Sequence, residues 1–583
     1  MHIPGRHRPR PLAALALTLL VIALSAASCG SDSRARSPQP LPDAQQVLRD
    51  ALFTNYVNPD SKPDVATYDP VMATDPTSAA IATLIYPSLV TLDSQLTVRP
   101  WAAQSLDVSS DGLTITFHLR SGMRFSDGEP IDATAFALSL NRALDPCVRA
   151  PDAWYLYPIA NAYAFNHETC AAPREHVAAG PIATLVGPGQ PLNPVDPLTL
   201  VVTLAQPSMR ALTALTAPIA FATPHNLIVE YGDQWANHLT DHGSFGGGLF
   251  ALSRTVDGGG LRLIRNNAFW GAAPRLREID YTLYSSTEAA WSAYQKGALD
   301  IGYPTGAIVA RATKSAAIQS TPVLQTTYLG LNWGRAPFTD QRLRQALALA
   351  IDKQAIATHQ FDGLVIPTNH IVPQGMTSYN PALVGPDSLQ GLAGNPTAAV
   401  NLARAFASSA CGGKFALCPA ISLEVSTADP DADVVAAEVA RMWQAVAPGY
   451  PLTVKVEPAT TFRQRVSDGA AQFYLGEWTA SYPDAYVALG RFASTTPGVS
   501  GSVNLLDANA LLITGESEQD STQRTRDEQA AEQLLVSDVA IIPLYQEQFF
   551  WQTPTRVQNV AFDPLGQMSV YDTWPTVVMM SAG

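Results

Sequence analysis

Alternating hydrophobic and polar positions predict strands at several places along the chain. Ile115, Phe117 and Leu119 alternate with polar residues, a pattern that is typical of a half-buried strand. The same period of two runs from Leu198 to Leu204 and predicts a second strand. The sequence Ser126-Asp127-Gly128, which follows the first of these strands, is typical of a turn.

A period of three to four residues predicts helices elsewhere. Asp132 is expected to cap a helix that carries Phe136, Leu140 and Leu144 on one face. A second capped helix is predicted after Asp340, because hydrophobic residues recur on one stripe behind it.

Residues 420–475 change pattern repeatedly. Strands are predicted at 421–425 and 452–456, and between them Asp433 is expected to cap a helix over 435–446. Strand, helix and strand in this order form a βαβ unit, so the fold class is α/β with mixed sheets.

Composition narrows the class of protein. A chain of 583 residues is too long to fold around a single hydrophobic core, so two or three lobes are expected. A hydrophobic content of 47% and a charged content of 15% exclude a disordered, collagen-like or coiled-coil chain. The net charge of −14 repels phosphate backbones, so no nucleic-acid partner is expected. The single long apolar run lies at the N-terminus, which excludes a multi-span membrane protein.

The N-terminus has the layout of a secretory signal. Three arginines precede an apolar stretch from Leu12 to Ala27, which is shorter than the roughly 20 residues that span a bilayer. Cys29 follows where a bacterial lipoprotein signal places its lipidated cysteine, although that pattern prefers Leu, Val or Ile at the position of Ala26. Residues 1–28 are therefore expected to be a lipoprotein signal peptide, and residues 29–44 a flexible tether. An ordinary cleaved signal peptide or an uncleaved anchor is the alternative.

Four further cysteines follow Cys29, and outside the cytoplasm they allow three pairings. Sequence proximity favours disulfides Cys147–Cys170 and Cys411–Cys418. Neither pair forms a CxxC motif, so the spacing does not suit zinc. We expect structural disulfides, no metal and no cofactor.

Four motifs, in order along the chain, resemble those of the extracellular solute-binding proteins of the oligopeptide and dipeptide importer class, solute-binding family 5. They lie at Leu119–Pro130, Leu263–Gly271, Asn332–Lys353 and Trp478–Asp484. The segments LRSGMRFSDGEP, LIRNNAFWG and WTASYPD are similar to the family patterns LRxGxxFSDGxP, LxRNPxYWG and WxADYPDP. Their order and spacing extend the resemblance over nearly the whole mature chain.

The resemblance implies a two-lobed clamshell of the periplasmic-binding-protein kind, in which a ligand favours closure of the lobes about hinges. Residues 45–88, 204–303 and 546–583 are expected to form lobe I, residues 89–203 an inserted subdomain, and residues 304–545 lobe II. The implied function is capture of a peptide or related polar solute for the permease subunits of an ABC importer. We expect a monomer outside the bacterial cytoplasm, held at the cell membrane by its lipid anchor.

The fourth motif bears on the ligand. In peptide-binding relatives, the Asp of WxADY pairs with the α-ammonium group of the ligand, a charge-assisted contact. Here Ser481 stands at that position, which puts linear free-amino peptides in doubt. Asp484 or Glu477 is expected to substitute, unless Asp484 only caps or turns the loop. Oligosaccharides, modified peptides and nickel-type chelates remain open.

The resemblance implies a set of ligand contacts around this motif and the helix before it. The expected ligand-binding residues are Asn332, Trp333, Trp478, Ser481, Tyr482 and Asp484. Trp478, Tyr482 and Tyr486 are expected to line an amphipathic pocket, and core packing is the alternative for Trp478.

Enzyme signatures are weak in this chain. His238 and His242 have the spacing of a zinc-protease helix, but Leu239 stands where the general-base Glu belongs. GxSxG, P-loop and GxGxxG–acid patterns are absent from the sequence. We therefore expect no catalytic residues and no enzyme activity. A secreted hydrolase or a non-transport solute sensor on the same fold is the alternative.

Overall fold

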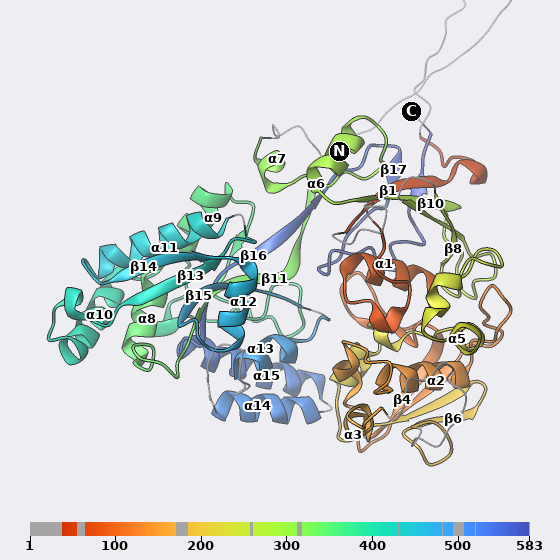
Figure 1. Cartoon of the computed structure of the whole chain (residues 1–583), viewed down its shortest axis with the longest axis horizontal. Coiled ribbons are helices and arrows are strands. Elements are labelled where there is room, and N and C mark those ends of the chain that lie inside the picture. Colours follow the sequence, from red (N-terminus) through yellow and green to blue (C-terminus); the bar gives the residue numbers. More distant parts are fainter. Residues whose placement is uncertain are drawn as a thin grey trace, which may run out of the picture.

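The computed structural model shows two lobes joined by two long strands (Figure 1). The described residues are 38–54, 64–170, 185–256, 260–311, 318–429, 431–480, 482–493, 506–518 and 520–581. The expected signal peptide, the lipidation site Cys29 and the ligand residue Ser481 lie outside these residues. Among the described residues, none of the helices has the length and apolar character needed to cross a bilayer.

The strands and helices are numbered along the chain. The strands are β1 (Val47–Phe53), β2 (Val90–Leu92), β3 (Val98–Pro100), β4 (Ala103–Val108), β5 (Thr114–Leu119), β6 (Leu192–Asp196), β7 (Thr199–Thr203), β8 (Phe250–Val256), β9 (Gly260–Arg265), β10 (Glu278–Tyr284), β11 (Gln319–Leu331), β12 (Ile366–Pro367), β13 (Ile421–Ser426), β14 (Leu452–Glu457), β15 (Phe473–Thr479), β16 (Ile541–Trp551), β17 (Val557–Gln558) and β18 (Val578–Met579). The helices are α1 (Pro76–Ile85), α2 (Ala133–Leu144), α3 (Ala162–Asn166), α4 (Arg210–Ala214), α5 (His225–Tyr231), α6 (Thr287–Gln295), α7 (Gly306–Arg311), α8 (Gln341–Ala350), α9 (Lys353–Phe361), α10 (Pro396–Ala410), α11 (Ala432–Val446), α12 (Ala459–Ser467), α13 (Ala485–Ala493), α14 (Leu506–Ser517) and α15 (Ser521–Ser537).

The first lobe is built on two four-stranded sheets. One sheet has the order β1-β10-β9-β8, with β1 and β10 parallel, and the other is the antiparallel sheet β4-β5-β7-β6. Its hydrophobic core combines residues from 48–303 with residues from 551–579, together with Tyr482 from the second lobe. The two ends of the chain therefore share one core, and Figure 1 shows the C-terminal segment beside β1 and β10.

The strand and helix predicted from the first motif are present in this lobe. β5 alternates buried and half-buried residues, and Asp132 caps α2 by accepting a hydrogen bond from the Ala135 N–H at 3.0 Å. The Arg120 Nε donates to the Trp101 carbonyl at 2.8 Å, and its guanidinium lies 5.2 Å from the Trp270 ring centroid. The first and second motifs therefore meet as packing and hydrogen-bonding elements of the first lobe.

The second lobe contains a mixed six-stranded sheet with the order β12-β16-β11-β15-β13-β14. β13 and β14 are parallel and α11 connects them, so the predicted βαβ unit is confirmed. The predicted cap of α11 is wrong: the helix begins at Ala432 after Asp431, and Asp433 lies in the first turn. An acidic side chain is favourable at either place, because the helix N-terminus carries a partial positive charge, and the pattern alone does not separate them.

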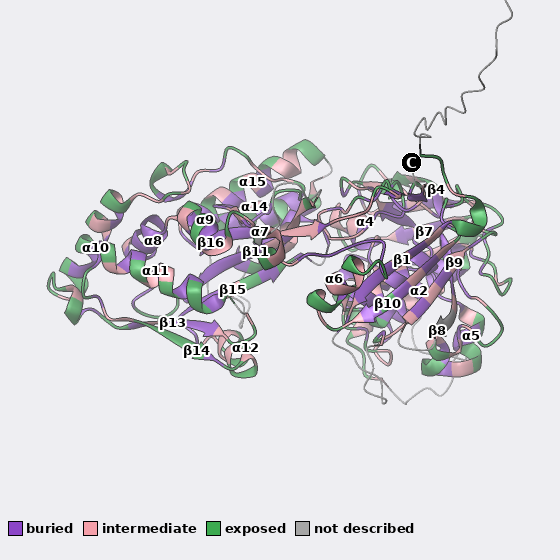
Figure 2. Cartoon of the chain, turned by 90° about the horizontal axis from the view of Figure 1, so that it is seen from above, coloured by how far each residue is buried: buried purple, intermediate pink, exposed green. Residues whose placement is uncertain are grey.

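Two strands of the second lobe extend toward the first lobe. β11 pairs antiparallel with β16 on one side and with β15 on the other. Beyond the end of β16, the N–H groups of Gly302 and Gln552 each donate to the other's carbonyl at 2.9 Å. Seen from above, buried residues run along the sheets of both lobes, and exposed residues cover the outer helices (Figure 2).

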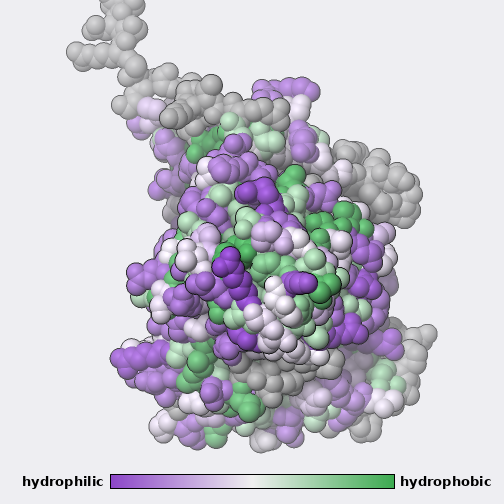
Figure 3. All heavy atoms as spheres, turned by 90° about the vertical axis from the view of Figure 1, so that its left-hand side faces the viewer, coloured by the Kyte–Doolittle hydropathy of each residue, from purple (hydrophilic) through white to green (hydrophobic). Residues whose placement is uncertain are grey.

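Both expected disulfides are present. Cys147 is bonded to Cys170, and Cys411, directly after α10, is bonded to Cys418. The far end of the second lobe, near α10, shows hydrophobic and hydrophilic residues interspersed over its surface (Figure 3).

Candidate functional site

A pocket of about 380 Å³ lies between the two lobes. The first lobe contributes Trp154 and Arg210, and the second lobe contributes residues of β15 and α13. The lining residues of the second lobe are Glu477, Trp478, Thr479, Tyr486, Val487, Gly490 and Arg491. The fourth motif therefore faces the first lobe, because β15 carries it to the edge of the sheet where the lobes approach each other.

The lobes touch beside this pocket, at what we call the interlobe contact: Tyr155, Arg210, Tyr482 and Glu516. The Tyr482 ring packs edge-on against Tyr155, with ring centroids 4.9 Å apart, and only 2% of Tyr482 is exposed. The Arg210 Nε lies 3.2 Å from Glu516 Oε1, and the same oxygen accepts a hydrogen bond from the Ser208 hydroxyl. A side chain of the first lobe thus neutralises a carboxylate of α14 in the second.

Electrostatics make this ion pair sensitive to separation of the lobes. Burial raises the pKa of Glu516, and the nearby Arg210 opposes that shift. Burial disfavours the charged form of Arg210, but the neighbouring Tyr482 and Glu516 outweigh it and raise the pKa of Arg210. The Arg210 guanidinium also lies 4.7 Å from the Tyr486 ring centroid, a cation–π distance. Arg210 therefore contacts three side chains of the second lobe.

Asp484, a predicted ligand residue, is held by a partner within the second lobe. Its Oδ2 lies 2.7 Å from Arg524 Nη2, and the exposed fractions of the two side chains are 2% and 14%. Its Oδ1 accepts a hydrogen bond from the Tyr486 N–H at 2.9 Å, at the start of α13. The carboxylate therefore has a buried cation and a backbone donor, which is the arrangement expected of a residue that caps and turns the loop.

The ion pair of Asp484 is part of a wider network in α15. Arg524 also lies 2.9 Å from Glu528 Oε1, and Ser378 donates to Glu528 at 2.5 Å. Burial raises the pKa of Glu528, and Arg524 opposes that shift. The Arg524 Nε has no hydrogen-bond partner among the described residues. One guanidinium therefore serves two buried carboxylates, which fixes α13 against α15.

Asn332 and Trp333 are placed apart from the other predicted ligand residues. In the antiparallel pairing of β11 with β15, Trp478 lies opposite Thr326. Asn332 follows six residues later, which at roughly 3.3 Å per residue is about 20 Å along the strand. The Asn332 amide donates to the Gly469 carbonyl at 2.9 Å, and the Trp333 indole donates to the Val539 carbonyl at 3.1 Å.

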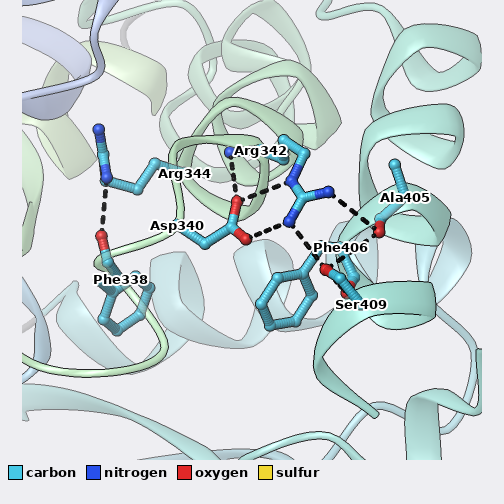
Figure 4. A network of polar contacts seen from close by, with 7 residues as sticks. All are labelled: Phe338, Asp340, Arg342, Arg344, Ala405, Phe406 and Ser409. Atoms are coloured by element: carbon cyan, nitrogen blue, oxygen red, sulfur yellow. Dashed lines mark hydrogen bonds and ion pairs between the residues drawn. The ribbon is translucent and has the colours of Figure 1, made fainter. Parts of the chain in front are cut away.

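The helix that follows Trp333 has an equally local role. The Arg344 guanidinium stacks on the Trp333 ring, 3.4 Å from its centroid. Asp340 caps α8 and binds Arg342 at 2.6 Å, and Arg342 reaches Ser409 on α10 at 2.8 Å (Figure 4). The hydrogen bonds from Arg342 lower the pKa of Asp340, and nearby Arg344 adds to the shift. The third motif thus holds α8 against α10 in the second lobe.

Trp478 joins the pocket and the core. Its exposed fraction is 6%, and it packs in the cluster that contains Tyr328 and Phe492 while one side lines the interlobe pocket. Sequence reasoning missed Trp154 and Arg210, because no motif marks them and the chain places them far before β15. The pocket can be identified only when the two lobes are seen together.

Four carboxylates gather where β15 and β16 approach the start of α11: Glu477, Glu547, Asp429 and Asp431. Burial raises the pKa of Glu477, and Asp429 raises it further. Burial raises the pKa of Glu547 to about 7, with added repulsion from Glu477. Glu477 lines the interlobe pocket and forms no ion pair with another of the described residues. Glu477 is therefore the carboxylate that this pocket offers to a cation.

Comparison with known proteins gives a consistent set of relatives. Residues 97–500 match the sequence profile of the bacterial extracellular solute-binding proteins, family 5 (middle part). The chain is 27% identical over 507 residues to the probable deoxycholate-binding periplasmic protein of Escherichia coli (strain K12), covering 86% of this chain and 88% of that protein. It is 26% identical over 323 residues to the glutathione-binding protein of Salmonella typhimurium (strain LT2), covering 54% of this chain and 56% of that protein.

Solved structures share the fold. The periplasmic murein tripeptide-binding protein MppA, in its unliganded open form, superposes with a TM-score of 0.73 at 21% identity, covering 94% of this chain and 99% of that one. OppA of Haemophilus influenzae, in complex with the peptide RPPGFSPFR, gives a TM-score of 0.67 at 21% identity, covering 93% and 100%. The two-lobed fold expected from the motifs is therefore confirmed. Because the family profile covers more than half of the sequence, the chain belongs to the bacterial extracellular solute-binding proteins, family 5.

Proposed function

We propose that this protein captures a small solute in the cleft between its lobes and delivers it to the permease subunits of an ABC importer. The observation that carries the proposal is the interlobe pocket, which draws its walls from both lobes. A ligand in such a pocket contacts both walls only when the lobes are close, so it favours the closed state by its differential affinity. The working step is closure, and the protein catalyses no reaction.

The solute class is set by the charges that face the pocket. Asp484 is neutralised by Arg524, so it is a poor partner for a ligand ammonium group. Glu477 takes that role in our proposal, since it lines the pocket beside Trp478 and Tyr486. Arg491, on the same wall, offers a cation to a ligand carboxylate. The pocket therefore suits a peptide-like solute or another small polar molecule that carries charges of both signs.

The relatives support this range of ligands. Their names describe a probable deoxycholate-binding protein, a glutathione-binding protein and a murein tripeptide-binding protein. Glutathione and a murein tripeptide carry charges of both signs, whereas deoxycholate carries a carboxylate on an apolar body, so the first two fit the charges of the pocket.

The first test is native mass spectrometry of the purified protein, followed by thermal-shift titration with glutathione, deoxycholate, and free and N-acetylated tripeptides. We expect at least one solute to raise the melting temperature, and small-angle scattering to show compaction with it. Glu477→Gln should weaken free-amino ligands more than N-acetylated ones, while the exposed control Asp433→Asn should leave both unchanged. Binding of no solute, or hydrolysis of one, would overturn the proposal.

We further propose a monomer anchored outside the cytoplasm through a lipid on Cys29. The support is the sequence around that cysteine, which follows a short apolar stretch in the manner of a lipoprotein signal. Cys29→Ser should release the protein from the membrane fraction into the soluble fraction after osmotic shock or into the medium. An unchanged distribution would show that another element anchors the chain.

A further inference from the structure

A second pocket lies in the first lobe, apart from the interlobe pocket. It has a volume of about 210 Å³ and lies between α1, β1 and the C-terminal segment. Its aromatic lining consists of Phe53, Tyr281, Tyr303, Phe549, Phe562 and Trp574. We name it the aromatic pocket. Figure 1 shows α1, which forms one wall, on the side of the first lobe that faces the second.

The rings form a connected wall instead of filling the space. Tyr303 lies 5.4 Å from Phe53 and 5.8 Å from Phe549, and Phe549 lies 4.9 Å from Phe562, measured between ring centroids. Phe53, Phe549 and Phe562 are only half-buried. Apolar rings that remain accessible around a cavity are typical of ligand sites, because exposing apolar side chains to water does not stabilise the fold.

The aromatic pocket offers little to a charged group. Lysine, arginine and histidine are absent from its described lining. The carboxyl there is Asp50, whose Oδ1 accepts hydrogen bonds from the Tyr303 hydroxyl at 2.7 Å and the Ala51 N–H at 2.8 Å. Burial raises the pKa of Asp50 to about 7, so this carboxyl is only partly ionised at neutral pH. The lining therefore suits an apolar group and not the terminal charges of a peptide.

A smaller pocket adjoins the aromatic pocket and includes a residue of the second lobe. Thr83, Leu565, Gln567 and Met568 line both this pocket and a smaller one of about 120 Å³, whose wall includes Tyr482 from the second lobe. Tyr482 also meets Tyr155 at the interlobe contact. The aromatic pocket therefore adjoins a smaller pocket that residues of both lobes line.

We propose that the aromatic pocket binds an apolar, ring-bearing part of the solute that this protein carries. The inference rests on the proposed function and adds a requirement to it, since a solute without such a group leaves the pocket unused. The volume exceeds the roughly 150 Å³ of an apolar cavity that holds benzene, so one ring fits with room to spare. The ring has two chemical sources, the side chain of a peptide residue and one ring of a fused steroid body.

The test fills the pocket from α1. Ala80 is half-buried and lines the aromatic pocket, so Ala80→Phe places a ring where the ligand's ring would lie. Ala289→Phe, at an exposed position of α6 in the same lobe, is the matched control. Phe549→Leu removes one ring from the wall without filling the space. Circular dichroism and thermal unfolding check that each variant folds.

The probes are the tripeptides Ala-Ala-Ala and Ala-Phe-Ala, and deoxycholate. We expect Ala80→Phe to weaken the ring-bearing probe that binds the wild type by roughly tenfold to a hundredfold, the range for burying one aromatic side chain. Phe549→Leu should weaken binding of the same probe by a smaller factor. Ala289→Phe should bind the probe like the wild type, and the affinity for Ala-Ala-Ala should be the same in all variants. Loss with Ala-Phe-Ala identifies a peptide side chain as the occupant, and loss with deoxycholate identifies a steroid body.

Two results overturn the inference and are distinguishable. If a ring-bearing probe binds the wild type and Ala80→Phe alike, or if only Ala-Ala-Ala binds, the aromatic pocket is not a ligand site while the proposed function stands. If none of the probes binds and native mass spectrometry finds no retained solute, the proposed function fails as well.

Discussion

Replacing Asp484 by Asn tests whether this carboxylate serves the ligand or the fold. Asn keeps the shape of the side chain and the oxygen that accepts the Tyr486 N–H, so the change isolates the charge. The lost partner of Arg524 is buried, and removing one member of a buried ion pair costs about 3–5 kcal/mol. We take the lower end, about 3 kcal/mol, because Arg524 keeps Glu528 at 2.9 Å.

The expected loss is large enough to measure in the second lobe. For a unit of roughly 150–250 residues, each kcal/mol shifts the melting temperature by about 2–4 °C, so the transition of this lobe should fall by about 6–12 °C. Differential scanning calorimetry measures the shift. Asp433→Asn is the matched control: Asp433 is exposed in the first turn of α11 in the same lobe, and loss of its charge should cost about 0.3–1 kcal/mol, well below the loss expected for Asp484.

Binding distinguishes the two roles of Asp484. If Arg524 neutralises it, the ratio of affinities for free and N-acetylated tripeptides should be the same in Asp484→Asn and the wild type. A variant that melts like the wild type, yet loses affinity for free-amino peptides alone, would refute the structural role and restore Asp484 as an ammonium site.

Three further changes address closure, pH dependence and the disulfides. Arg210→Ala removes the cation that meets Glu516 across the lobes, so the population of the closed state should fall by about tenfold or more. Small-angle scattering should then show a larger radius of gyration, and an unchanged scattering profile would contradict this. Burial lowers the pKa of Lys353 to about 7, whereas the unfolded chain holds that proton up to its ordinary value of 10.5. Folding thus releases a proton between these values, so wild-type stability should rise with pH by about 1.4 kcal/mol per unit there, and Lys353→Met should lose that slope in urea unfolding at pH 7.5 and 9.5. Replacing both Cys147 and Cys170 by Ser removes a disulfide whose cysteines are 23 residues apart, which should lower the free energy of unfolding by about 3 kcal/mol. Calorimetry measures this loss, and an unshifted unfolding transition would contradict it.

Local elements could be predicted from the sequence because their signals are local. The caps at Asp132 and Asp340 each depend on residues within one turn of each other, and each strand and helix of the βαβ unit around α11 is visible in the period of its own residues. The same locality explains the error at Asp433, since a carboxylate one or two residues inside a helix start produces the same pattern as a cap.

The interlobe contact could not be predicted in this way. Arg210 and Glu516 are separated by 306 residues, and neither belongs to a motif. Their pairing depends on how far the two lobes are closed, which is a property of the whole fold. Motifs are better guides to residues that hold an element together, such as Asp340 and Arg342, than to residues that meet only across a cleft.

The fourth motif shows why a charge cannot be transferred along the sequence by proximity alone. Asp484 lies three positions after Ser481, which made it the natural substitute for the family's carboxylate. The intervening turn directs it instead to the start of α13 and to Arg524 on α15, where its charge is already balanced. Glu477, on the strand before the turn, keeps its place on the wall of the interlobe pocket, where burial raises its pKa and repulsion from Asp429 adds to the shift. In the function proposed above, a ligand ammonium group relieves that electrostatic cost on closure, so recognition of a cation by Glu477 would favour the closed state.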